Sequence, residues 1–212
     1  VVLTLPFTML RMVDVEAGLF ADDKAQIVSE LGYGQNSKLM MQLTSKPWRT
    51  TSMAGGAGFT DNGAQTFWET SRGQSGELGI LTHFAGGDGG LALGAGTPDS
   101  QATRILPLLD AVFPGTQAAF NGRALRMHWP QAPFHGGSYA CYRPGQWEFF
   151  GVEGRAEGNI HFAGEHTSED YQGYMEGAAE SGARAAREIL AALGIMAPAP
   201  LRSRRSRRPR RR

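Results

Sequence analysis

The residues best suited to chemistry lie at 159–190, where a strand, a polar loop and a helix follow one another. The apolar run at 160–163 is typical of a short buried strand, and the loop at 165–172 leads to a helix that begins near Gly173. The free N–H groups and the dipole of a helix start favour an anion at that end. Gly173 and Gly177 would let a flat or charged ligand approach the backbone.

The same helix is equally typical of a surface helix that crosses its neighbours closely through small residues. Helical spacing of its apolar and small residues predicts one stripe against a core. The stripe consists of Met175, Ala178, Ala179, Gly182, Ala186, Ile189, Leu190 and Leu193. Spacing alone does not decide between a ligand site and a packing face.

The amino-acid sequence of this stretch resembles the C-terminal flavin-binding motif of the flavin-containing amine oxidases, the monoamine and polyamine oxidase family. FAGE at 162–165, GYMEGA at 173–178 and the SGARAA that follows a glutamate carry the resemblance. It implies FAD as the cofactor. Gly164 and Glu165 would then contact its phosphate and ribityl side, and Gly173, Tyr174 and Met175 would lie beside the flavin ring.

A second segment, GGSYACYRPGQW at 136–147, resembles another site motif of the same family. Some members attach FAD through a cysteine directly after the glycine pair. Ser138 occupies that position, and Cys141 lies three residues later, so the resemblance implies non-covalent FAD. Tyr139 matches one aromatic wall of the substrate cage and Tyr174 the other. Trp129 matches an aromatic residue near the flavin, although a core position suits it equally.

Lys38 lies in a predicted strand at 38–43, where a lysine is ordinarily an edge residue in contact with solvent. The segment GYGQNSKLM at 32–40 resembles the part of the family that carries a lysine near the flavin. The resemblance implies that Lys38 holds a water against flavin N5 and assists oxygen reduction. We therefore predict catalytic roles for Lys38, Tyr139 and Tyr174.

The resemblance implies oxidative deamination of an amine, with a hydride equivalent passed to flavin N5 and oxygen reduced to hydrogen peroxide. Two tyrosine faces would attract and orient the amine. A small-molecule amine and molecular oxygen are the expected partners, and a homodimer stays open. An L-amino-acid oxidase on the same scaffold is the alternative. It would need an arginine for the substrate carboxylate, and Arg49, Arg72 and Arg143 are candidates.

The composition, 41% hydrophobic with 29 glycines, is that of a globular chain. The single cysteine excludes an internal disulfide and a cysteine-based zinc site, and the five histidines lack ligand spacing, so we expect no metal. No apolar run is long enough for a transmembrane helix. The opening VVLTLPFTML lacks a basic region and a cleavage site, which favours a soluble, cytoplasmic protein over an exported one.

The last twelve residues, LRSRRSRRPRRR, contain eight of the 21 basic residues. Without them, 13 basic residues face 20 acidic ones, a net charge of −7. Such a run predicts disorder, because it offers no apolar surface to offset the entropy of ordering. It would be a nucleic-acid-binding arm of a non-catalytic piece, or a solvated tail without function.

We predict an α/β architecture in four parts. Residues 1–29 end a strand of a Rossmann-like FAD domain and cross over, 30–135 form an α+β substrate domain with a mixed sheet, 136–196 return to the FAD domain, and 197–212 are the arginine-rich tail. Expected elements include helices at 22–31 and 100–113, a hairpin of 65–71 with 79–84, and a strand at 124–129. The GxGxxG unit that holds the FAD pyrophosphate in the family is not in these residues. We therefore expect a fragment that binds FAD weakly and is inactive alone.

Overall fold

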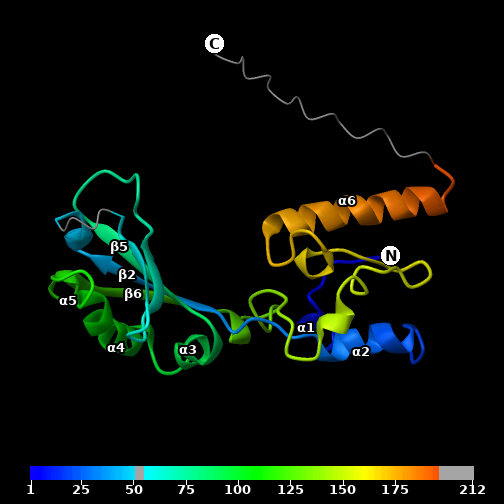
Figure 1. Ribbon diagram of the computed structural model, residues 1–212, viewed down its shortest axis with the longest axis horizontal. Helices are drawn as coiled ribbons and strands as arrows, with labels where there is room; N and C mark the ends of the chain where they lie inside the picture. The colour runs from blue at the N-terminus through cyan, green and yellow to red at the C-terminus, as the bar shows by residue number, and fades with distance from the viewer. Residues whose placement is uncertain (51–54, 196–212) are drawn as a thin grey trace, which may run out of the picture.

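The computed structural model describes residues 1–50 and 55–195, which form two lobes joined by two crossing segments (Figure 1). One lobe is built on a sheet, and the other carries the segments from both ends of the described chain. The predicted tail at 197–212 lies outside the described residues, so its role stays a prediction. None of the helices in the described ranges has the length and apolar character needed to cross a membrane.

The sheet lobe contains five strands in the order β3-β4-β5-β2-β6. They are β2 (Ser37–Leu43), β3 (Ala57–Thr60), β4 (Gln65–Glu69), β5 (Gly79–Ala85) and β6 (Phe120–His128). All pairings of this sheet are antiparallel within the described residues. The expected mixed sheet is therefore corrected, because short connections join β3, β4 and β5, and these allow only antiparallel neighbours. The predicted β4–β5 hairpin is confirmed.

Helices cover one face of this sheet. They are α3 (Gly87–Ala92), α4 (Pro98–Asp110) and α5 (Thr116–Ala119), with the short η1 (Pro47–Arg49) at the far end. Leu39, Met41 and Leu43 of β2 point into the core with Ile105 and Leu109 of α4. The alternate residues of β2 are only half-buried, because side chains along a strand alternate between its two faces. The second face of the sheet is therefore left for contacts other than these helices.

The second lobe joins segments that are distant in sequence. Strand β1 (Val2–Leu3) pairs in parallel with β7 (His161–Phe162), and both pack with α1 (Phe7–Leu10) and α2 (Asp22–Glu30). The turns η2 (Trp129–Gln131), η3 (Trp147–Phe149) and η4 (Glu165–Thr167) complete it, together with α6 (Met175–Ala192). This lobe has its own hydrophobic core. The separate cores support the predicted domain division, whose boundaries stay a prediction.

Helix α6 starts close to the predicted position, but the predicted face is wrong. Its buried residues are Gly177, Ser181 and Ala185, whereas Met175 and Gly182 are exposed. The small residues face inward because the backbone of other segments approaches the helix closely: a Cβ on Gly177 would lie 2.3 Å from a main-chain oxygen. Figure 1 shows that α6 begins at its end nearest the sheet lobe. The N–H groups of its first turn therefore lie on the side of the sheet lobe.

Candidate active site

The segment that carries Tyr139 is tied to the chain just before β2. Gly34 N–H donates to the Tyr139 carbonyl at 2.8 Å, and Ser138 N–H donates to the Gly34 carbonyl at 2.9 Å. Glycine is required on both sides of this contact, because a Cβ on Gly34 would lie 2.5 Å from Ser138 Oγ, and one on Gly137 would lie 2.6 Å from a tyrosine Cβ. The chain therefore passes Tyr139 shortly before it enters β2.

Glu165 joins the two tyrosine segments to each other. Its carboxylate accepts a hydrogen bond from Ala140 N–H at 2.9 Å through Oε1 and from Gly173 N–H at 2.6 Å through Oε2. Burial raises the pKa of the Glu165 carboxyl, and its two N–H donors oppose that rise. We call this arrangement the Glu165 clamp. It connects the backbone next to Tyr139 with the backbone next to Tyr174, although about 35 residues separate the two along the chain.

The clamp brings the Tyr139 ring against the start of α6. A Cβ placed on Gly173 would lie 3.7 Å from Tyr139 Cδ2, which is ordinary van der Waals contact. Tyr174 and Met175 follow at once and are 71% and 91% exposed, while Tyr139 is 38% exposed. Large apolar side chains gathered at the first turn of a helix form a surface suited to an uncharged, flat ligand.

A pocket of about 260 Å³ lies beside the clamp. It draws its walls from the end of β1, the second motif and the FAGE turn. Its lining comprises Thr4, Pro6, Tyr33, His135, Gly137, Ser138, Gly164, Glu165, His166 and Ala178. The structure thus brings Gly164, Glu165 and the position of the family's covalent cysteine together in one pocket. Ser138 donates its hydroxyl to Asn36 Oδ1 at 2.6 Å, and the sole cysteine, Cys141, is exposed outside this lining.

The pocket is lined by a turn at which glycine is required. Gly164 has φ +125°, and a Cβ there would lie 2.8 Å from the His166 ring. Its N–H donates to Ser181 Oγ at 2.9 Å and its carbonyl accepts from Thr167 Oγ1 at 2.9 Å, so a cofactor in this pocket would meet the surface of a turn whose own hydrogen bonds are already made. His166 Nε2 is buried and has no hydrogen-bond partner in the described part of the chain. Burial, and to a lesser degree the charge of Lys24, lowers the pKa of His166 to about 4, so this ring is neutral at pH 7.

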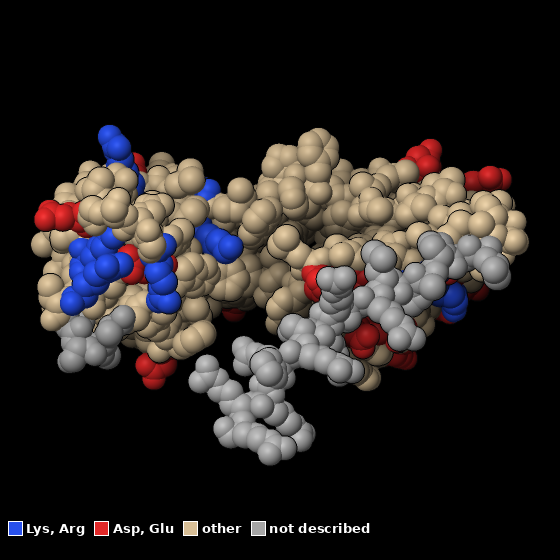
Figure 2. Space-filling view, turned by 90° about the horizontal axis from the view of Figure 1, so that it is seen from above, with Lys and Arg blue, Asp and Glu red and all other residues tan. Residues whose placement is uncertain are grey.

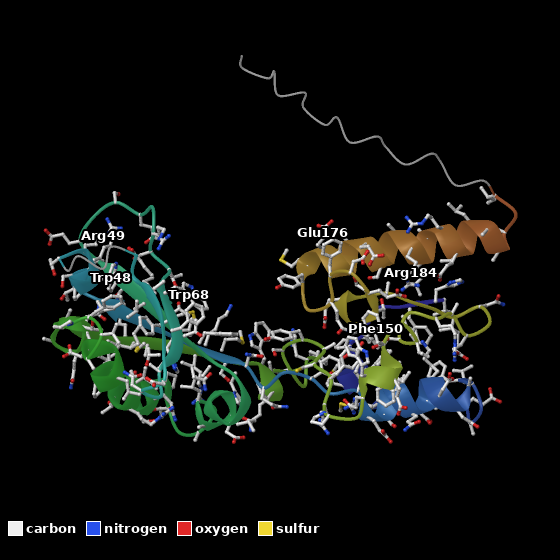
Figure 3. All side chains as sticks on the ribbon, in the orientation of Figure 1. Trp48, Arg49, Trp68, Phe150, Glu176 and Arg184 are labelled. Carbon is white, nitrogen blue, oxygen red and sulfur yellow. The ribbon has the colours of Figure 1, made fainter. Side chains whose placement is uncertain are left out.

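Lys38 lies on the face of the sheet that the helices leave open. Its Nζ lies 5.9 Å from the Trp68 ring centre and 5.8 Å from the Phe84 ring centre. These distances place the ammonium at the edge of an aromatic pair. Figure 3 places Trp68 on the side of the sheet lobe that faces the start of α6. Lys38 is therefore on the wall opposite the tyrosines, rather than in contact with them.

The remaining predicted residues lie at varying distances from this region. Trp129 opens η2 and packs on His135, with ring centres 5.1 Å apart, so it lies next to the pocket. Arg49 pairs with buried Glu69 at 3.1 Å, and Figure 3 places Arg49 at the end of the sheet lobe away from α6. Arg72 donates to the Gly55 carbonyl. Neither arginine faces the tyrosines. On the face seen in Figure 2, Lys and Arg gather on the sheet lobe, and Asp and Glu gather on the second lobe.

Sequence reasoning missed two features of the site. The role of Glu165 as a backbone clamp has no signal in the sequence, because the family resemblance implies only a cofactor contact for this residue and both of its N–H partners are distant from it along the chain. His166 directly follows Glu165, but its burial against Phe7, with ring centres 4.6 Å apart, depends on α1 and has no local signal. No group of three or more His, Cys, Asp or Glu side chains suited to a metal occurs within residues 1–50 and 55–195.

Comparison with known proteins identifies the class to which this chain belongs. The family model described as flavin containing amine oxidoreductase matches residues 1–190. The chain therefore belongs to this family, which uses a flavin to oxidise amines or amino acids. Membership confirms the α/β fold expected from the sequence.

Individual relatives define the extent of the match. The putative L-amino-acid oxidase YobN of Bacillus subtilis is 29% identical over 192 residues, which is 89% of this chain and 40% of that protein. Flavin-containing amine oxidase A of Bos taurus is 39% identical over 98 residues, or 45% of this chain and 19% of that protein. The chain thus spans at most about two-fifths of these proteins.

Solved structures give the same extent. Cyclohexylamine oxidase from Brevibacterium oxydans superposes with a TM-score of 0.79 and 25% identity, over 91% of this chain and 43% of that one. Putrescine oxidase bound to putrescine superposes with a TM-score of 0.77 over 90% of this chain and 42% of that one, and at 18% identity it shows a shared fold alone.

Proposed function

We propose that this chain supplies the substrate-facing and flavin-facing walls of an FAD-dependent amine oxidase. FAD, when bound, accepts the hydride equivalent from the carbon next to the amine nitrogen and supplies the redox chemistry. The chain binds and orients the reactants and excludes water. The products are an imine, which water converts to an aldehyde, and hydrogen peroxide from oxygen.

The backbone geometry supports the cofactor roles that the family resemblance implies. Gly164, which has no side chain, would let the phosphate and ribityl side approach the turn, and Glu165 holds the turn in place through the Glu165 clamp. Gly173, Tyr174 and Met175 would lie beside the flavin ring at the N-terminal end of α6, whose dipole would stabilise negative charge there. Trp129, which packs on His135, would lie near the same ring. Ser138 cannot form a thioether, which supports non-covalent FAD.

Substrate roles fall to the tyrosines and the lysine. Tyr139 and Tyr174 flank the amine, because aromatic faces attract a cation and align its C–H bond for transfer. Lys38, on the opposing sheet face, holds a water and stabilises the anionic charge that develops as oxygen is reduced. The observation that carries this proposal is the Glu165 clamp, which sets Tyr139 against the residue that precedes Tyr174.

An L-amino acid is the competing substrate class, since one relative that matches most of the chain is named a putative L-amino-acid oxidase. An amino acid needs a cation for its carboxylate. Arg49 is held by Glu69 and Arg72 by a backbone carbonyl, so neither is free for that role. Arg143 follows Tyr142 in the second motif and is the candidate that stays. An amine without a carboxylate is our first proposal, because two of the three candidate arginines are engaged elsewhere, and an L-amino acid held by Arg143 is the second.

The test uses a fusion of this chain to the amino-terminal part of cyclohexylamine oxidase, loaded with FAD. Peroxide release is measured with a coupled peroxidase across a panel of amines and L-amino acids. We expect release with amines that Tyr139→Ala and Tyr174→Ala each abolish, while flavin absorption is retained. Oxidation of L-amino acids in place of amines would support the alternative. A yellow fusion that oxidises neither class would contradict the proposal.

The 212 residues alone give a second measurement. Because the chain spans about two-fifths of its relatives, we expect it to bind FAD weakly and to release no peroxide by itself. Stable, stoichiometric flavin on the purified chain would contradict that expectation.

A further inference from the structure

A chain of hydrogen-bonded polar side chains runs from the segment of Tyr174 through the segment of Tyr139 into the core of the second lobe. Gln172, two residues before Tyr174, donates from Nε2 to the Tyr142 hydroxyl at 3.0 Å and to the His166 carbonyl at 3.1 Å. Tyr142, three residues after Tyr139, donates its hydroxyl to the Glu153 carboxylate. Gln172 and Tyr142 therefore form a side-chain link between the same two segments that the Glu165 clamp joins through backbone.

The far end of this chain is fixed in the core. Glu153 is 2% exposed and Lys24 is fully buried. Lys24 Nζ donates to the carbonyls of Val152 and Glu153 at 2.6 and 2.7 Å, and it lies 4.2 Å from the Phe162 ring centre. The loop that presents the Glu153 carboxylate is thus held by α2 and β7. The acceptor for the Tyr142 hydroxyl therefore has a fixed position in the core.

The protonation states suit this direction of hydrogen bonding. Burial raises the pKa of the Tyr142 hydroxyl, and the hydrogen bond to Glu153 raises it further. The Tyr142 hydroxyl therefore keeps its proton at neutral pH and donates a hydrogen bond to Glu153. The hydroxyl oxygen of Tyr142 then stays free to accept the hydrogen bond from Gln172. The Tyr142 ring packs edge-on against Trp147, with centres 5.5 Å apart, so the ring cannot follow a displaced loop easily.

We infer that Tyr142 and Gln172 are positioning residues that set the separation of the Tyr139 and Tyr174 rings. This inference rests on the proposed function, in which those two rings flank the amine. The Glu165 clamp holds the 172–174 turn through the Gly173 amide, while the hydrogen bond from Tyr174 N–H to the Tyr171 carbonyl at 3.1 Å is local to the turn. The Tyr142–Gln172 bond adds a second attachment to the segment of Tyr139, this time through side chains, and two attachments fix an orientation better than one.

The experiment labels the five tyrosines of the chain with 3-fluorotyrosine and records fluorine NMR spectra at pH 7. Single Tyr→Phe variants assign the signals of Tyr139 and Tyr174. Tyr142→Phe keeps the ring and removes the hydroxyl. Gln172→Met keeps the length and removes the donor, while leaving the Tyr142–Glu153 bond intact. We expect each variant to shift or broaden both signals.

Tyr171→Phe is the matched control, because Tyr171 is 48% exposed, adjoins Gln172 and makes no hydroxyl hydrogen bond in the described structure. It should leave both signals in place. In the FAD-loaded fusion, Tyr142→Phe and Gln172→Met should lower kcat/KM for the amine roughly tenfold to a hundredfold, since about 1 Å of misplacement costs about 10²-fold.

Unchanged signals in Gln172→Met would overturn the inference, whether or not Tyr142→Phe folds. A lower free energy of unfolding with unchanged signals would show that the two residues only stabilise the lobe. The spectra need no bound flavin and no turnover. Failure of the oxidase proposal therefore appears in the peroxide assay alone, and failure of the positioning role appears in the spectra.

Discussion

Removal of the Glu165 carboxylate should separate the two tyrosine segments at a calculable free-energy cost. Glu165→Leu takes away both acceptors. Ala140 is only 7% exposed, so its N–H cannot reach bulk water, and a buried donor left unpaired costs about 1–3 kcal/mol. Gly173 is half-buried, and its N–H regains a partial hydrogen bond to water. We expect the free energy of unfolding to fall by about 2–3 kcal/mol for Glu165→Leu.

Glu165→Gln separates the two contacts. The amide keeps one acceptor oxygen and turns a donor toward the other N–H, so we expect a loss of about 1 kcal/mol. Because burial raises the pKa of Glu165, the folded chain holds this proton more tightly than the unfolded chain. The stability due to this group is therefore complete at acidic pH and is lost as pH rises through the folded pKa. The difference in free energy of unfolding between the wild type and Glu165→Gln should therefore become smaller as the pH rises from acidic to neutral.

Urea unfolding followed by tryptophan fluorescence measures both variants, with the slope against urea as a check on two-state behaviour. Glu169→Leu is the matched control, because Glu169 lies exposed in the same loop and makes no hydrogen bond in the described ranges. Equal stability of Glu165→Leu and Glu169→Leu would refute the clamp. So would Glu165→Leu spectra in which the fluorotyrosine signals of Tyr139 and Tyr174 do not move.

Three further outcomes follow from the same geometry. Gly164→Ala should lower the free energy of unfolding by about 1–3 kcal/mol and weaken flavin binding, because the φ of Gly164 is +125° and the His166 ring blocks a Cβ there. Gly182 is exposed on α6 with open space around it, so Gly182→Ala should instead raise the free energy of unfolding by about 0.5–1 kcal/mol in the same urea assay. Lys38→Met should lower the rate of oxygen consumption by the FAD-loaded fusion about tenfold or more. The rate at which the amine bleaches the flavin absorption without oxygen should stay unchanged. A parallel loss of both rates would contradict a role of Lys38 in oxygen reduction. Burial lowers the pKa of His83 to about 4. Between about pH 6.5 and 4, the unfolded chain therefore binds a proton at this residue that the folded chain does not. The free energy of unfolding should fall by roughly 3 kcal/mol as the pH drops through this range. His83→Leu should remove that loss, and an unchanged difference between unfolding at pH 7 and pH 4.5 would contradict it.

The positions of the strands and helices could be predicted well because their signals are local. The alternation along β2 and the hairpin of β4 with β5 follow from side-chain period and turn residues. Helix α4 begins at Pro98, two residues earlier than predicted, because Thr97 and Ser100 form a capping box. Pro107 stays inside that helix. The antiparallel pairing throughout the sheet depends on connections whose course is a property of the whole lobe.

The face of α6 illustrates what the sequence could not supply. Alanine, glycine and serine occur on several sides of this helix, and such small residues suit a close backbone contact as well as an apolar core, so the apolar stripe alone does not identify the buried face. The buried face is set by Ser181, whose hydroxyl accepts from Gly164 N–H at 2.9 Å, and by Gly177, which lets the Tyr171 carbonyl approach. Both contacts come from the loop between β7 and α6. The hydrogen bonds and close contacts of this loop therefore determine which face of α6 is buried, rather than the hydrophobicity of the residues on that face.

The same loop explains why the exposed residues and the site coincide. Once Gly177 and Ser181 turn inward, Met175 turns outward, because it lies two residues before Gly177 and so on a different side of the helix. Tyr174 is the N-cap residue, has an extended backbone outside the helical spacing, and is 71% exposed. The Glu165 clamp then fixes Gly173, the residue before Tyr174, next to Tyr139. A residue type could be matched to a role from the sequence. The outward direction of that residue depends on the backbone contacts of residues that carry no chemistry themselves.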